Sequence, residues 1–293
     1  MKKNTSRLIG VMIVLFFLSA LLFSIRFISL SGQKKIAQPY AKLDEKNISE
    51  IIIEGIPAKV LLHKESNAWY IQENKTSYPA DTEKIKKIIE AVKGFKKDEV
   101  VSTNTNKHKE FGIGNQTLSF VVNKKKNTLF IGNGYAFEKN YVRLNDEKEI
   151  YIAGGFQSIL SESSYKELLL NLIGDENKVD SITIVYPDNQ IQLKKNNNDW
   201  LVNNKKIDKN KAVFLLSDLK GLQATDMLIE DIDPAVKGNT IAIVINENRK
   251  ERTVNLYQLD DDYYRVKISD NKYIYKISTS SIESLMKKEE DFL

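Results

Sequence analysis

The residues able to carry acid–base or metal chemistry are few and far apart. The 293-residue chain has two histidines, His63 and His108, and no cysteine. His108 lies in the polar segment "NTNKHKEFGIG", with no second histidine or acidic residue at the spacing of a metal ligand. Without cysteine there is no disulfide, thiolate metal site or catalytic thiol. The sequence therefore indicates neither a histidine-based triad nor a zinc site.

Acidic and glycine-rich segments are the next candidates. The cluster Asp226, Glu230, Asp231 and Asp233 and the run at 260–262 lack the Asp/Asn alternation and the glycine of a calcium loop. They are interpreted as solvated loops. "GNGYAF" (132–137) has no third glycine and precedes no helix, so a hairpin is expected rather than a phosphate site. We predict a protein that is not an enzyme and has no catalytic, metal or cofactor residues.

Aromatic residues could instead form a binding surface. Several of the 13 tyrosines gather in "DDDYYRVKISDNKYIYKI", and Tyr263, Tyr264 and Tyr273 are the candidate contact surface for a carbohydrate or a protein. Packing in the core explains the same pattern and is the favoured interpretation. The two tryptophans, Trp69 and Trp200, are predicted to be structural anchors.

The N-terminus predicts a location. Leu8–Ile25 is a run of apolar or small residues preceded by Lys2, Lys3 and Arg7. Its length suits a transmembrane helix, and the basic residues favour a cytoplasmic N-terminus. The expectation is a single-pass protein of the cell membrane, with the rest of the chain outside the cytoplasm. A cleaved signal peptide, with Ser29 and Ser31 before the cut, is the alternative.

Composition limits the partners. The net charge of +5 is spread along the chain, and 28% of the residues are charged. A spread charge suits mild attraction to an anionic membrane surface, whereas nucleic-acid binding would require Lys and Arg clustered on one element. We expect no nucleic-acid partner.

The chain also repeats itself. An offset of 131 residues, which separates Trp69 from Trp200, aligns "ISEIIIEG" (48–55) with "VDSITIVY" (179–186). Both copies alternate apolar and polar residues in the same phase, which predicts three successive strands. Two further strand segments align later in each copy. "TLSFVVN" (117–123) aligns with "TIAIVIN" (240–246) at offset 123, and 141–152 aligns with 265–276 at offset 124.

Two amphipathic helices belong to the same repeat. Residues 81–95 place apolar side chains at helical spacing, and 208–222 match them at offset 127. Asp81 and Asp208 are the predicted N-caps. The expected fold class is α+β, with an N-terminal transmembrane helix and two tandem modules, each a mostly antiparallel sheet packed on a helix. The expected boundaries are 1–32 for the cytoplasmic tip and anchor, 33–44 for a stalk, 45–155 and 178–293 for the modules, and 156–177 for a helical connector.

Several motifs resemble a known family. The tryptophan at Trp69, "YPAD" at 78–81, "FGI" at 111–113, "LFIG" at 129–132, "YVR" at 141–143 and "IY" at 150–151 are similar to the bacterial proteins grouped as domain of unknown function 4340. The second module lacks "YPAD" and the "IG" turn. The resemblance implies a membrane-anchored accessory protein, often encoded beside gliding-motility-type ABC transporter components. It transfers no catalytic residue.

Three functions follow as expectations. The first is a non-enzymatic, membrane-anchored extracytoplasmic protein that binds or assembles with other envelope proteins, such as the subunits of an ABC-type transporter. The second is an envelope protein that holds a sugar or peptide in the cleft between the modules. The third, least favoured, is an unrecognised hydrolase, which would require a buried pair of carboxylates with perturbed pKa values.

Overall fold

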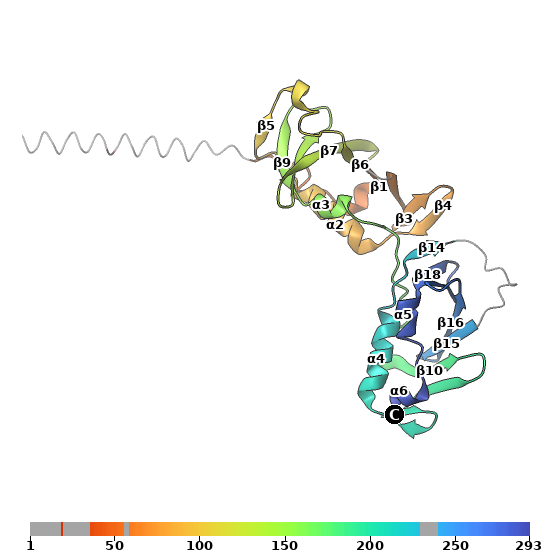
Figure 1. Ribbon diagram of the computed structural model, residues 1–293. Coiled ribbons are helices and arrows are strands. Elements are labelled where there is room, and N and C mark those ends of the chain that lie inside the picture. Colours follow the sequence, from red (N-terminus) through yellow and green to blue (C-terminus); the bar gives the residue numbers. More distant parts are fainter. Residues whose placement is uncertain (1–18, 20–35, 56–58, 198, 229–239) are drawn as a thin grey trace, which may run out of the picture.

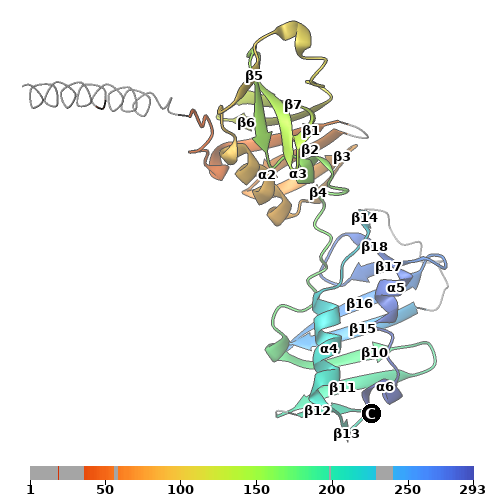
Figure 2. The same cartoon turned by 60° about the vertical axis from the view of Figure 1, so that its left-hand side comes forward.

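Two antiparallel β-sheets make up most of the chain. The computed structural model describes residues 19, 36–55, 59–197, 199–228 and 240–293. The first sheet has the strand order β4-β3-β2-β1-β6-β7-β8-β9-β5 and the second the order β13-β12-β11-β10-β15-β16-β17-β18-β14. The two orders correspond strand for strand, and Figures 1 and 2 show the sheets as two bodies joined by one segment.

Most strands lie next to their neighbours in sequence, as expected of meanders; the exceptions are β1 beside β6 and β9 beside β5, with β10 beside β15 and β18 beside β14 in the second sheet. Those of the first sheet are β1 Ile48–Glu54, β2 Lys59–Glu65, β3 Ala68–Glu73, β4 Thr76–Pro79, β5 Val100–Ser102, β6 Gln116–Val122, β7 Lys125–Ala136, β8 Lys139–Leu144 and β9 Ile150–Gly154. Those of the second are β10 Val179–Val185, β11 Gln190–Asn196, β12 Asp199–Val202, β13 Lys205–Lys206, β14 Asp226–Leu228, β15 Thr240–Glu247, β16 Lys250–Gln258, β17 Tyr263–Ile268 and β18 Ile274–Ser278.

One long helix packs on each sheet. These are α2 (Thr82–Gly94) and α4 (Lys209–Lys220), and the other described helices are α3 Gln157–Leu160, α5 Thr279–Glu283, α6 Glu289–Phe292 and the 3-10 turns η1 Glu45–Asn47, η2 Thr105–Lys107 and η3 Glu176–Lys178. The predicted N-caps are confirmed: the Asp81 carboxylate accepts from two backbone N–H groups and that of Asp208 from one. We call the first sheet with α2 and α3 module one, and the second with α4, α5 and α6 module two. Figure 2 shows α4, α5 and α6 on one face of the second sheet.

Strand register fixes which residues of the two modules are equivalent. Ile51 pairs with Leu62, and Ile182 pairs with Leu193, so the predicted offset of 131 holds for the first two strands of each sheet. Between β6 and β15 the predicted offset of 123 is wrong: the pairings of Ile53 with Leu118 and of Ile184 with Ile243 give 125. A strand alternates with period two, so a shift by two residues keeps the same side chains facing the core and is invisible to the pattern.

The segment that precedes each sheet packs onto it. Residues 36–44 were expected to form a stalk, but the backbone N–H of Lys97 donates to the carbonyl of Ala37 at 2.9 Å. The ring of Tyr40 meets that of Phe120 edge-on at 4.8 Å between centroids. Burial raises the pKa of Tyr40 to about 12, and the charge of Glu147 adds to the effect. This part of the predicted stalk therefore belongs to module one.

The connector is extended, so the predicted helices at 156–177 are wrong beyond α3. Its backbone adds to both modules: the N–H of Glu167 donates to the carbonyl of Pro79 at 2.8 Å, and that of Leu170 to the carbonyl of Leu222 at 3.0 Å. Tyr165 and Leu172 are buried. These tertiary bonds satisfy the backbone groups that a helix would have satisfied internally, and they override the local helical pattern.

The expected fold class is wrong as well. It combined α+β modules with an N-terminal transmembrane helix, whereas the described chain is mainly antiparallel sheet and only two of its described helices exceed five residues. Among the described residues, no helix combines the length and the apolar character needed to cross a bilayer. Apart from Ser19, the residues of the predicted span lie outside the described part.

Candidate functional site

The sequence candidates for chemistry do not come together. His63 Nε2 lies 2.9 Å from Glu65 Oε1, and His108 Nε2 lies 3.1 Å from the carbonyl oxygen of Lys148. In the described ranges, no group of three or more His, Cys, Asp or Glu side chains is placed to hold a metal ion. Asp260 Oδ1 accepts from the backbone of Asp262, which makes the acidic run a turn. Of the other acidic cluster, residues 230, 231 and 233 lie outside the described residues.

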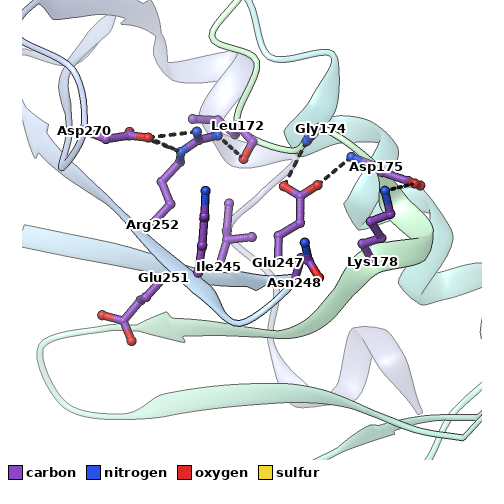
Figure 3. Close-up of a pocket in the computed structure, with 11 residues that line it drawn as sticks. Leu172, Gly174, Asp175, Lys178, Ile245, Glu247, Asn248, Glu251, Arg252 and Asp270 are labelled. Carbon is purple, nitrogen blue, oxygen red and sulfur yellow. Dashed lines mark hydrogen bonds and ion pairs between the residues drawn. The ribbon is translucent and has the colours of Figure 1, made fainter.

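A pocket lies where the connector packs on the β15–β16 hairpin of module two, and we call this contact the clasp (Figure 3). The volume of the pocket is about 690 Å³. Glu247 accepts from the backbone N–H groups of Gly174 and Asp175, at 3.0 and 2.6 Å. Arg252 donates to both carboxylate oxygens of Asp270 and to the carbonyl of Leu172. The charged groups of Glu247 and Arg252 are therefore engaged in holding the connector on module two.

Module one has a corresponding clasp, but Val122 and Asn127 stand at the positions of Glu247 and Arg252, so backbone contacts remain where these side chains are replaced. Its pocket is lined by residues 39–47 and 122–127, which occupy the positions of 170–178 and 247–252 in module two. Asn123 donates from its backbone to the carbonyl of Asn47, as Asn248 does to Lys178. A feature that both modules retain is part of the shared scaffold, so functional differences should be sought where the modules differ.

The two tryptophans are part of that scaffold. Trp69 is 5% exposed and Trp200 is 3% exposed, and both belong to the hydrophobic core. Their pairings are equivalent, because Trp69 lies opposite Lys64 and Trp200 lies opposite Lys195. The indole Nε1 of Trp69 also donates to Glu45 at 3.3 Å. Neither ring is presented to a ligand.

A buried lysine lies where the modules meet. Lys166 of the connector is 4% exposed, and its ammonium lies 2.8 Å from Glu73 of module one and 2.7 Å from Asp226 of module two. It also lies 4.2 Å from the ring centroid of Tyr78. Burial by itself lowers the pKa of Lys166, but its hydrogen bonds to Asp226 and Glu73 outweigh burial and raise the pKa above its usual value.

The predicted tyrosine surface is not an exposed surface. Tyr273 is 5% exposed, and its ring packs 5.9 Å from that of Tyr78 across the junction. Tyr264 lies in the core of module two, where burial raises its pKa. Tyr263 is half-buried beneath the ammonium of Lys276, 3.7 Å from its ring centroid. The strand alternation placed Tyr264 on the apolar side of β17, which is the side that faces the core.

The sheet face opposite α2 distinguishes the modules. We call it the open face; its position pairs in module one are Ile52–Leu61, Phe130–Arg143 and Tyr141–Ile152. The equivalent pairs of module two are Thr183–Gln192, Asn255–Lys267 and Arg265–Lys276. At five of these six positions module one carries an aliphatic or aromatic side chain and module two a polar or charged one. Arg143 is matched by Lys267, and on the same face Ser119, opposite Ile52, is matched by Val244.

The open face continues onto the hairpin of β7 and β8. The rings of Phe111 and Tyr135 lie 4.7 and 5.6 Å from that of Tyr141. Beyond them, Phe137 at the tip is 91% exposed. Sequence reasoning missed this surface because it compared the repeats only at their inward positions; the outward positions carried the signal.

Glycines hold a bulge at the base of this hairpin. Register shifts occur between Ile131 and Gly134, whereas β16 and β17 pair without a shift. Gly112 has φ +68, and a Cβ there would lie 2.3 Å from Asn133 Oδ1. A Cβ on Gly132 would lie 2.3 Å from the carbonyl oxygen of Phe111, to which Asn133 N–H donates at 2.9 Å. The "FGI" and "IG" motifs thus meet, and bulges of this kind often redirect side chains at functional sites.

Comparison with known proteins gives one match. A family model described as "Domain of unknown function (DUF4340)" matches residues 69–240, more than half of the chain. No curated protein and no solved structure gives a significant match. The matched residues include the β7–β8 hairpin, the connector and α4.

Proposed function

We propose that this chain, which belongs to the DUF4340 family, is a non-enzymatic binding protein. It assembles with other envelope proteins through the open face of module one. The family resemblance points to the subunits of an ABC-type transporter as the partner. The contrast between the open faces carries the proposal. Because module two folds with polar residues at these positions, folding does not require the apolar ones of module one.

The chemistry of the open face suits binding to a protein. Aromatic side chains and arginine are enriched at protein interfaces, where they supply most of the binding free energy. Here the guanidinium of Arg143 lies 3.9 Å from the ring centroid of Phe130. Burial lowers the pKa of Arg143, and the nearby negative charge of Asp146 raises it by a smaller amount. An exposed ring at the tip, Phe137, adds an anchor that a partner could enclose.

A location at the cell membrane, with both modules outside the cytoplasm, is part of the proposal. It rests on the apolar run Leu8–Ile25 and the basic residues before it. Protease added to intact spheroplasts should then digest the modules. Full protection of the modules, with digestion only after lysis, would contradict this location.

The alternative, a ligand held between the modules, has less support. It depended on aromatic rings facing a cleft, but Tyr273 and Tyr78 pack on each other and are buried. Lys166 lies beside them with both of its carboxylate partners in place. These side chains support a junction rather than a ligand site.

Module two provides the substitutions that test the proposal. Leu61→Gln, Phe130→Asn and Tyr141→Arg place in module one the residues that the same positions carry in module two, Gln192, Asn255 and Arg265. Affinity purification of the tagged full chain from detergent-solubilised membranes should recover an ABC transporter subunit or another envelope protein. The triple variant should lose that protein.

Asn255→Ala with Lys267→Ala on the open face of module two is the matched control, and it should retain the partner. Equal recovery by the triple variant and the parent would contradict the assigned face. Recovery of no envelope protein by the parent would contradict the function itself.

A further inference from the structure

A second feature found in module one and replaced in module two is a pocket beside the β7–β8 hairpin. We call it the amide pocket. It has a volume of about 520 Å³, within the usual range of about 300–1,000 Å³ for ligand sites. Its lining is Asn115, Gln116, Gly132, Asn133, Gly134, Asn140 and Gln157. Every lining side chain is a carboxamide, and the remaining positions are glycines.

Asn140 is the buried member of the lining. It is 3% exposed, and its Nδ2 donates to the carbonyl oxygen of Gly132 at 3.3 Å. That bond fixes the orientation of the amide, because the reverse orientation would bring two acceptors together. Its Oδ1 has no hydrogen-bond partner among the described residues. A buried acceptor without a partner is costly, so packing alone does not account for an amide at this position.

Module two fills the equivalent space with apolar side chains. The position of Asn140 is occupied by Tyr264, since Asn140 pairs with Ala153 and Tyr264 pairs with Ile277. The position of Gln116 is occupied by Ile241. Tyr264 and Ile241 are each 7% exposed. The ring of Tyr264 therefore fills in module two the space that amide side chains line in module one.

The amides define the chemistry of the ligand. A carboxamide donates and accepts hydrogen bonds without bearing charge at any ordinary pH. A neighbouring pair of hydroxyl groups on a sugar also donates and accepts, and it is neutral. An extended peptide would need apolar subsites for alternate side chains, and the lining offers none. We propose that the amide pocket binds a neutral carbohydrate.

Ligand-observed saturation-transfer NMR on the full chain tests this site. The probes are glucose, galactose, N-acetylglucosamine, maltose and cellobiose, with N-acetyl-glycylglycinamide as the peptide probe. At least one sugar should give a saturable signal. Asn140→Tyr and Gln116→Ile, which install the module-two residues, should weaken that affinity by about tenfold or more, since they remove hydrogen bonds and volume. Gln192→Ala removes an exposed amide from module two and should leave the affinity within about twofold.

Three outcomes would overturn the site. These are no saturable signal from any sugar, a saturable signal from the peptide probe alone, and unchanged sugar affinity in Asn140→Tyr. If circular dichroism shows that Asn140→Tyr is misfolded, Gln157→Ala replaces it, because this exposed side chain can be removed without loss of packing. Asn140 and Tyr141 are neighbours on β8 and lie on opposite faces of the sheet, so Asn140→Tyr should still recover the envelope partner in the purification described above.

Discussion

The ammonium group of Lys166 lies 2.7 Å from Oδ1 of Asp226. Asp226 begins β14, the edge strand of the second sheet, and Lys166 forms a backbone bridge with Ala80 beside the first. The same ammonium reaches Glu73 at 2.8 Å. One buried cation therefore joins carboxylates of both modules.

Replacing this cation should loosen the junction. Lys166→Met keeps the length of the side chain but leaves Asp226 and Glu73 without their shared partner. We expect the free energy of unfolding to fall by about 1.5–3 kcal/mol, because hydrogen bonds to a charged group are worth about this much. Small-angle X-ray scattering should show a wider distribution of distances between the modules. Lys84→Met is the control, since Lys84 bonds to Glu162 and to the carbonyl of Ser164 without reaching module two. An unchanged scattering profile for Lys166→Met would contradict the assigned role.

The same lysine predicts a pH dependence on the alkaline side. Its pKa is raised in the folded protein, so its contribution to stability is complete below the unfolded pKa of about 10.4 and is lost as pH rises through the folded value. Denaturant unfolding of the parent should show this loss above the unfolded pKa. Lys166→Met, which cannot titrate, should show a smaller loss over the same interval. Parallel curves for the two proteins would contradict this assignment.

Truncating the tryptophan of module one should destabilise that module. Trp69→Ala removes a buried ring, and such a truncation usually costs about 3–5 kcal/mol. Trp200→Ala is the matched substitution in module two, where the ring has the same strand position and similar burial. Chemical denaturation should show a loss in both variants. If Trp69→Ala unfolds at the same denaturant concentration as the parent, Trp69 is not a structural anchor.

Adding a methyl group at the hairpin bulge should disturb it. Gly112→Ala places a Cβ 2.3 Å from Asn133 Oδ1 in a backbone conformation with positive φ, and the conformation alone costs about 1–2 kcal/mol. Gly114→Ala is the control, because it also has positive φ but nothing within 4 Å of the added Cβ. Gly112→Ala should lower the melting temperature more than Gly114→Ala, and it should weaken sugar binding at the amide pocket. Equal effects of the two substitutions would mean that the contact with Asn133 is unimportant.

The elements that periodicity could predict were those with one buried side. The stripe of α2 (Ile85, Ile88, Ile89, Val92) is buried as expected, and the alternation in β1 and β10 gives the observed pairing. The connector could not be predicted, because its backbone partners, Pro79 and Leu222, are distant in sequence. The candidate site depends on outward residues such as Phe130 and Tyr141. The sequence of one repeat alone does not distinguish them from other strand residues. They stand out only when they are compared with the equivalent residues of module two, Asn255 and Arg265.

The clasps show what each repeat inherits. Residues 39–47 lie on the β6–β7 hairpin as 170–178 lie on the β15–β16 hairpin, so a repeat begins well before its first strand. A gene segment that began at β1 or β10 would therefore lack the preceding residues that cover its own hairpin. The duplicated unit is therefore a sheet together with the segment that precedes it and packs on it. Part of the connector between the modules belongs to the second copy of that unit.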